Sequence, residues 1–154
     1  MGKLGDHFPP EQKQGYIDRH LVAGQVLYLF CHFTEPPKEK YLVLVCAGTE
    51  ALLFVVNSSV PPFVRRRPEL LRCQVHLSAS DHPFLDHNSV INCAEVIRAS
   101  NQLDIVAQIA ADIGRIKGSL NETTKKQVVD AVRKARTISP ADRRAIEDAL
   151  GRDE

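Results

Sequence analysis

Two long apolar runs, joined by a short connection, constrain the fold of this chain most. Residues 41–48 and 49–59 consist almost entirely of uncharged side chains, many of them branched or aromatic, so neither run has a face suited to water. Branched and aromatic residues favour strands, and the connection at 47–50 is short enough for a tight turn. We therefore predict a buried hairpin at the centre of a β-sheet.

Three further segments are expected to extend this sheet. Residues 24–33 are rich in aromatic and branched side chains, residues 71–79 alternate apolar and polar side chains as a half-buried strand does, and residues 89–97 form a short last strand. Prolines and consecutive arginines at 61–69 predict a long surface loop. Five strands joined in this way indicate a small antiparallel barrel.

From residue 101 the apolar side chains recur at the spacing of a helix. Leu103, Val106, Ala110 and Ile113 form one stripe, and Gly118 follows where a helix end favours glycine. We therefore predict a first helix that ends near Gly118.

Two more helices are expected after it. Ser119 and Glu122 have the spacing of a capping box, which predicts the start of the second helix. The third has a capping hydroxyl at Ser139, a proline at its first position and Gly151 at its end. The apolar face of the second helix could pack on the barrel or across a dimer, and the sequence does not choose between them. This face consists of Val128, Val129, Val132 and Ala135.

These patterns predict an α+β protein with a flexible lead-in over 1–20, a β-barrel over 21–100 and a C-terminal three-helix tail over 101–154. With 154 residues, 44% hydrophobic and 25% charged, the chain has the composition of a packed globular protein. Its formal charge of +1 gives no global attraction to nucleic acid or anionic membrane, so any polyanion site must be local. Neither a signal peptide nor an apolar run of membrane-spanning length is recognisable, and we expect a cytoplasmic protein with reduced cysteines.

Metal and thiol chemistry have weak support in the sequence. The sequence contains enough cysteines and histidines for a tetrahedral zinc site, namely Cys73, His76, His82, His87 and Cys93. Cys73 and His76, however, are three residues apart on a predicted strand, so their side chains point to opposite faces. None of the four cysteines lies at a helix start or in basic surroundings that would lower its pKa. We predict structural roles for these residues, with no metal and no cofactor.

Two loops carry the groups that could form a polar site. Residues 81–89 hold His82 and His87 around an apolar Phe84-Leu85 pair, and this loop could be either a site or an anchored turn. Basic residues on two other loops could converge into a phosphate-binding rim with Phe63 stacking on a base, or could simply be solvated. These basic residues are Lys38, Lys40, Arg65, Arg66 and Arg67.

The order of segments resembles the PemK/MazF-like family of toxin ribonucleases over about residues 24–97. The matching features are the strand 24–30, a charged loop, the strand 40–45 and a third strand that ends in Asn57-Ser58-Ser59. The resemblance implies an SH3-like barrel and metal-independent cleavage of single-stranded RNA, in which the ribose 2′-hydroxyl is the nucleophile. It further implies a homodimer held in check by a small antitoxin protein.

Carried over residue by residue, the resemblance assigns catalytic roles to Lys40 and to Ser58 or Ser59. Separately from the resemblance, His82 or His87 could supply acid–base work near neutral pH if their loop folds over the site. Lys40 stands where the family has arginine, and Tyr41 where it has proline, so the planar two-pronged donor of arginine is absent. RNA binding is expected from the basic rim and from Phe63 and His87. The alternative function is a non-enzymatic module that binds a protein partner or forms an oligomer.

Overall fold

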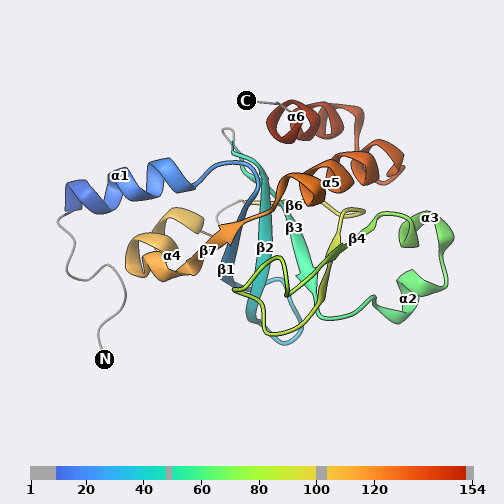
Figure 1. Cartoon of the computed structure of the whole chain (residues 1–154), viewed down its shortest axis with the longest axis horizontal. Coiled ribbons are helices and arrows are strands. Elements are labelled where there is room, and N and C mark those ends of the chain that lie inside the picture. The colour runs from blue at the N-terminus through green and yellow to red at the C-terminus, as the bar shows by residue number, and fades with distance from the viewer. Residues whose placement is uncertain (1–9, 48–49, 100–103, 152–154) are drawn as a thin grey trace.

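The computed structural model describes residues 10–47, 50–99 and 104–151. Within these ranges, seven strands form an antiparallel sheet that curls into a half-barrel (Figure 1). The strands are β1 (Gln25–Cys31), β2 (Lys38–Cys46), β3 (Leu52–Asn57), β4 (Gln74–Leu77), β5 (Ser89–Asn92), β6 (Ile97–Arg98) and β7 (Ile116–Ser119).

The helices precede, interrupt and follow these strands. None of the helices in the described part of the chain is long and apolar enough to cross a membrane. They are α1 (Pro10–His20), α2 (Pro62–Arg65), α3 (Pro68–Leu71), α4 (Ile105–Ala111), the 3-10 turn η1 (Ile113–Arg115), α5 (Glu122–Lys134) and α6 (Pro140–Leu150). Four parts of the predictions lie outside the described residues: the lead-in 1–9, the connection 48–49, Leu103 and the end of the tail at 152–154.

The strand order is β4-β5-β3-β2-β1-β7, with β6 pairing β3. The central hairpin is confirmed, because β2 and β3 pair antiparallel with Leu42 opposite Val55. On its other side β2 pairs β1, which places Tyr28 opposite Tyr41. The predicted class is also confirmed: the protein is α+β, with an antiparallel barrel-like sheet followed by C-terminal helices.

Each face of the sheet has its own apolar core. Val43, Phe54 and their neighbours pack under α5 and α6, with Val132 and Ile146 fully buried among them. The other face is covered by α1 and α4 and contains other members of the same strands, such as Leu29 (Figure 1). Because side chains alternate across a strand, uniformly apolar strands are what a sheet covered on both faces requires.

The first predicted helix is shorter than expected, and its extension to Gly118 is wrong. α4 ends at Ala111, where Asp112 adopts an extended backbone and accepts a hydrogen bond from the Gly114 amide at 3.0 Å. The chain then forms β7, which pairs antiparallel with β1. Glycines make a helix less stable in this segment. Pairing with the open edge of β1 outweighs the helical spacing of the apolar residues.

Of the caps predicted for the last two helices, one is wrong and one is confirmed. The predicted capping box at Ser119 is wrong, because Ser119 lies in β7 and Asn121 caps α5 by accepting a hydrogen bond from the Thr124 amide at 2.8 Å. The α6 boundary is confirmed: Ser139 accepts from the Asp142 amide at 3.2 Å. The apolar face of α5 packs within the chain's own core rather than remaining open to a second copy.

Two segments expected to lack regular structure contain helices. Residues 10–20 of the predicted lead-in form α1, and Ile17 is buried against the sheet. The proline-rich surface loop contains the single-turn helices α2 and α3, each with proline in its first turn. Proline has the backbone angle that a helix start needs, so the same residues that exclude a strand allow these turns.

Candidate functional site

A pocket of about 250 Å³ lies where β2 begins and β3 ends, and we call it the β2–β3 pocket. The sheet brings together here two of the predicted catalytic residues and two of the predicted RNA-binding residues. Its lining includes Tyr28, Lys38, Lys40, Asn57, Ser58 and His87.

Lys40 is the central cation of this pocket. Its Nζ donates a hydrogen bond to Asn57 Oδ1 at 2.7 Å, and the side chain is half-buried. Burial lowers the pKa of Lys40, and repulsion from Lys38 lowers it further, while the nearby Cys31 thiol acts in the opposite sense. An ammonium group that has already lost part of its hydration is well suited to stabilise a phosphate oxygen.

Aromatic rings form one wall of the same pocket. The Tyr28 and Tyr41 rings lie 4.7 Å apart between centroids, and the Lys117 ammonium lies 5.7 Å from the centroid of Tyr28. The Tyr41 hydroxyl donates to the Phe84 carbonyl at 3.2 Å. Burial raises the pKa of Tyr41, and the Asp86 carboxylate adds to this effect, so the hydroxyl keeps its proton.

His87 is exposed at the rim of the pocket, on the loop that the sequence singled out. Its Nδ1 lies 3.0 Å from the Asn88 carbonyl oxygen. A carbonyl can only accept, so Nδ1 carries the proton and Nε2 is the basic nitrogen of the neutral ring. His87 therefore offers a proton acceptor beside Ser58 and Lys40.

His82 lies elsewhere and has a different environment. Its ring is only 2% exposed and does not line the β2–β3 pocket. Nδ1 lies 3.0 Å from the Ser78 carbonyl, and Nε2 accepts from the Asn121 amide at 3.4 Å. Because both ring nitrogens are already engaged by the backbone, His82 joins its loop to the start of α5, and His87 is the better candidate for acid–base work.

The other predicted RNA-binding residues lie outside the β2–β3 pocket. Ser59 is exposed beside Ser58, and Arg65, Arg66 and Arg67 are exposed on and after α2. Phe63, 59% exposed, lines a second and larger cavity of about 480 Å³.

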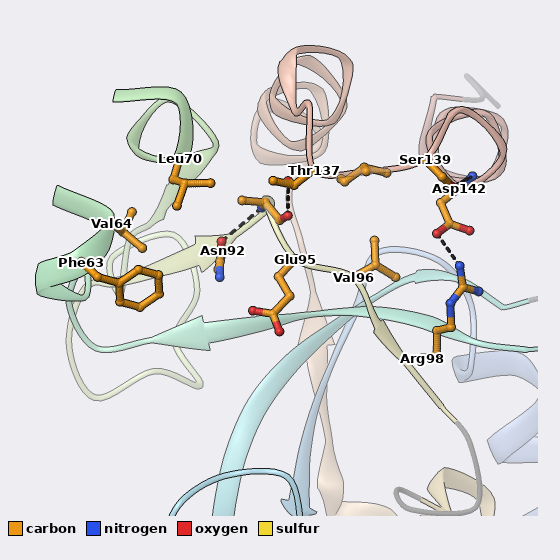
Figure 2. Close-up of a pocket in the computed structure, with 12 residues that line it drawn as sticks. Phe63, Val64, Leu70, Asn92, Glu95, Val96, Arg98, Thr137, Ser139 and Asp142 are labelled. Atoms are coloured by element: carbon orange, nitrogen blue, oxygen red, sulfur yellow. Dashed lines mark hydrogen bonds and ion pairs between the residues drawn. The ribbon is translucent and has the colours of Figure 1, made fainter. Parts of the chain in front are cut away.

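We call this cavity the helix-side pocket (Figure 2). Its walls come from α2 and α3, from β5 and β6, and from the connection between α5 and α6. Its lining includes Phe63, Asn92, Glu95, Arg98, Ser139 and Asp142.

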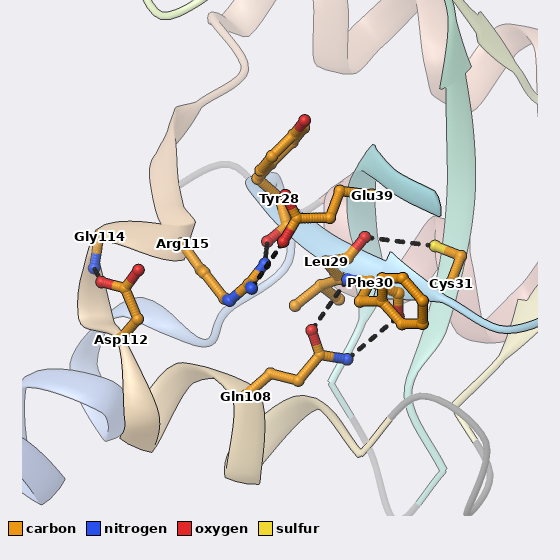
Figure 3. A network of polar contacts seen from close by, with 9 residues as sticks. All are labelled: Tyr28, Leu29, Phe30, Cys31, Glu39, Gln108, Asp112, Gly114 and Arg115. Carbon is orange, nitrogen blue, oxygen red and sulfur yellow. Dashed lines mark hydrogen bonds and ion pairs between the residues drawn. The ribbon is translucent and has the colours of Figure 1, made fainter. Parts of the chain in front are cut away.

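Two residues of the tail hold the outer edge of β1, and sequence reasoning missed both. Arg115 pairs with Glu39 at 2.6 Å and donates to the Tyr28 carbonyl at 2.9 Å. The Gln108 amide accepts from the Phe30 amide at 2.8 Å and donates to the Phe30 carbonyl at 3.2 Å (Figure 3). These side chains continue the edge pairing beyond β7, and Arg115 forms an ion pair with Glu39, a lining residue of the β2–β3 pocket.

The four cysteines are free, and Cys31, Cys73 and Cys93 are poorly suited to nucleophilic catalysis. Burial raises the pKa of Cys31 to about 11 and also raises the pKa of Cys73 and of Cys93. A thiol that keeps its proton at neutral pH is a weak nucleophile. Cys73 is buried while His76 is exposed, as expected from their opposite faces, and the described residues contain no cluster with the makings of a metal site.

Comparisons with known proteins find similarity in structure and none in sequence. No family model matches the chain, and no curated protein matches it in sequence. A solved structure described as an endoribonuclease in complex with its cognate antitoxin, from a mycobacterial species, is similar with a TM-score of 0.47 and 13% sequence identity. The likeness covers 86% of this chain and 97% of that chain.

Proposed function

We propose that this protein is an endoribonuclease that cleaves single-stranded RNA without a metal ion, as the toxin of a toxin–antitoxin pair. The observation that carries the proposal is the 2.7 Å contact between Lys40 and Asn57 in a pocket that also holds Ser58 and His87. These groups supply a cation, a hydroxyl and a base around one small space. The resemblance of residues 24–97 to PemK/MazF-like ribonucleases points to the same chemistry.

The proposed reaction is attack of a ribose 2′-oxygen on the adjacent phosphorus. His87 Nε2 removes the proton of the 2′-hydroxyl, and the bond from phosphorus to the 5′-oxygen breaks, so the products are a 2′,3′-cyclic phosphate and a 5′-hydroxyl that takes its proton from water. Lys40 stabilises the negative charge that grows on the phosphate oxygens, and Ser58 donates a hydrogen bond to one of them. Asn57 keeps Lys40 pointed at the phosphate.

RNA binding in this proposal combines stacking with charge. Tyr28 offers an aromatic face at the pocket wall, Lys117 lies near it, and Lys38 is exposed at the rim. Base stacking and phosphate contacts of this kind hold single strands with little dependence on sequence. We expect a small antitoxin protein to inhibit the enzyme by covering the same pocket, and we expect the toxin to act in the cytoplasm as a homodimer.

The decisive test is Lys40→Ala. Wild-type protein should cleave single-stranded RNA in the presence of EDTA, and the variant should be slower by about 10²- to 10³-fold, because a preorganised charge is lost at the transition state. Circular dichroism checks that the variant is folded. Lys126→Ala, which removes an exposed lysine of α5 outside the pocket, is the matched control and should cleave at the wild-type rate.

The same variants separate this proposal from the non-enzymatic alternative. Expression of the wild type without a partner should arrest growth, and Lys40→Ala should relieve the arrest. If purified wild-type protein cleaves no RNA, or if Lys40→Ala cleaves as fast as the wild type, the ribonuclease proposal is wrong and a binding module becomes the better description.

A further inference from the structure

We propose that the helix-side pocket binds a guanine base of the RNA substrate and so gives the enzyme its sequence preference. This inference rests on the proposed ribonuclease function and adds a second subsite to it. The starting observation is that Phe63, an exposed aromatic residue, lines a cavity of about 480 Å³ together with polar groups from β5 and the segment after it. Cavities of this size commonly take small organic ligands.

The hydrogen-bonding capacity of this pocket is defined by Asn92 and Glu95. Asn92 Oδ1 already accepts from Gln74 Nε2 at 2.9 Å and from the Ala94 amide at 3.1 Å, which fixes the orientation of the Asn92 amide. Its Nδ2 is therefore left as a donor. Figure 2 shows this nitrogen and the Glu95 carboxylate on the side of the pocket where the Phe63 ring lies. Glu95 has no ion pair or side-chain hydrogen bond among the described residues.

A carboxylate beside an amide donor matches guanine better than the other bases. The Watson–Crick edge of guanine presents two adjacent N–H donors, which one carboxylate can accept together, followed by the O6 acceptor, which the Asn92 amide can satisfy. Uracil has a single N–H between two carbonyls that would repel a carboxylate, while adenine and cytosine place an acceptor next to their amine. Phe63 supplies the stacking surface that every base can use.

The charges around the pocket favour a nucleotide over the basic side chain of a protein partner. Arg65 ends the α2 turn that carries Phe63, Arg66 and Arg67 follow it, and none of the three has an ion pair among the described residues. Arg98, in contrast, is already paired with Asp142 at 2.5 Å and Glu50 at 3.6 Å. Unpaired cations beside the pocket and the exposed, unpaired Glu95 carboxylate in its lining suit a ligand with anionic phosphates and a donor-bearing base, and the cations would repel an incoming arginine.

The chain connects the two pockets directly. Ser58 of the β2–β3 pocket and Phe63 of the helix-side pocket belong to one short segment, 58–63. Ser89 and Asn92, the two ends of β5, also line one pocket each, and a strand of this length separates them by about 10 Å. A short stretch of extended single strand can therefore place a guanine in the helix-side pocket while a nearby phosphodiester lies beside Lys40.

The test is to titrate the full chain with nucleoside monophosphates in an isothermal calorimeter. Guanosine 5′-monophosphate should bind more tightly than uridine 5′-monophosphate by at least about tenfold. With uracil the Glu95 carboxylate would face a carbonyl oxygen, and this repulsion weakens binding. Inosine 5′-monophosphate, which lacks the 2-amino group, should fall between them. Glu95→Gln should lower the affinity for guanosine monophosphate by at least about tenfold because a charged hydrogen-bond acceptor is lost.

Glu69→Gln is the matched control, because Glu69 is an exposed carboxylate on α3 that does not line the pocket, and it should bind guanosine monophosphate as the wild type does. Phe63→Leu should also lose affinity, and its ring is too exposed for the change to unfold the protein. The proposal is overturned if guanosine and uridine monophosphates bind equally, if neither binds, if Glu95→Gln is without effect, or if N-acetylarginine amide occupies the pocket in their place.

The outcome is separable from that of the proposed function. Lys40→Ala should keep full affinity for guanosine monophosphate. RNA cleavage that depends on Lys40, without selective guanosine binding, overturns the guanine subsite alone. Selective guanosine binding that depends on Glu95, without any RNA cleavage, overturns the ribonuclease and supports only the base-binding pocket.

Discussion

The β2–β3 pocket and the helix-side pocket differ first in their charge. The β2–β3 pocket contains Lys38, Lys40 and His87. In the helix-side pocket Arg98 is paired with Asp142, so the unpaired charge there is the Glu95 carboxylate. A phosphate needs cations, while a base needs hydrogen-bond partners and an aromatic surface. Under the proposed function, one RNA strand places a phosphate in the β2–β3 pocket and a base in the helix-side pocket. The protein needs no large net positive charge for this, because the cations are local.

The pockets differ also in how firmly the fold holds them. Lys40 and Asn57 belong to the paired strands β2 and β3, so the sheet itself fixes their spacing. The helix-side pocket depends on the connection between α5 and α6, where Thr137 donates to the Ala94 carbonyl and Ser139 caps α6. Sites built on sheets are more rigid than sites that depend on connections, so the helix-side pocket should be the easier one to disturb alone.

The largest effect expected from this comparison is the loss of stacking at the β2–β3 pocket. Tyr28→Leu keeps an apolar side chain but removes the aromatic face, and RNA affinity should fall by about 5- to 150-fold, corresponding to about 1–3 kcal/mol. Fluorescence anisotropy with a labelled 2′-O-methyl RNA, which cannot be cleaved, measures this change.

Tyr28→Phe is the matched control, because it keeps the ring and should keep the affinity. Neither variant should alter the binding of guanosine monophosphate in the helix-side pocket. A loss of guanosine binding in Tyr28→Leu would show that the two pockets are one coupled site, and the contrast between them would not hold.

The next effect concerns the pH dependence of cleavage and involves only the β2–β3 pocket. Lys40 must carry its proton to stabilise the transition state, and burial and Lys38 lower its pKa. As pH rises through this lowered pKa the charge is lost, so cleavage should decline by about tenfold per pH unit, beginning at a lower pH than for an ordinary lysine. Cleavage rates in EDTA across alkaline pH, with uncatalysed hydrolysis subtracted, give this profile.

Two variants identify the group responsible. Lys38→Gln removes the repulsion and should shift the decline to higher pH, but only in part because burial is the larger cause. Lys40→Arg keeps its charge throughout the measurable range, so its decline should disappear. A profile unchanged in both variants would assign the alkaline decline to another group. Guanosine binding should not follow the Lys40 titration in any of these proteins.

Much of the sheet and part of the site could be predicted from local patterns. The runs at β2 and β3 have so little polar surface that a buried hairpin was the simplest solution, and Ser139 with Pro140 marks the start of α6 unambiguously. The family resemblance suggested that Lys40 and Ser58 act together, and both line the β2–β3 pocket near the ends of those strands.

The rest depended on contacts that are distant in sequence. Helical spacing of apolar residues predicted a longer first helix, but pairing of β7 with β1 decides the structure there. Arg115 acquires its contacts through that pairing. The helix-side pocket draws Phe63, Glu95 and Asp142 from separate elements. No spacing along the chain signals such a set, and Phe63 was accordingly expected beside the lysines.

The smallest predicted effect tests whether the helix-side pocket can be disturbed alone. Ser139→Ala removes the hydroxyl that accepts from the Asp142 amide, and loss of such a cap should lower the free energy of unfolding by about 1 kcal/mol. Urea denaturation measures this, and Ser139→Asn, which restores a cap, is the control. Because Ser139 lines the helix-side pocket, guanosine affinity should fall while RNA cleavage at saturating substrate stays at the wild-type rate. Equal losses of guanosine affinity and of RNA cleavage would mean that α6 stabilises the β2–β3 pocket as strongly as the helix-side pocket. The two pockets could then not be disturbed separately.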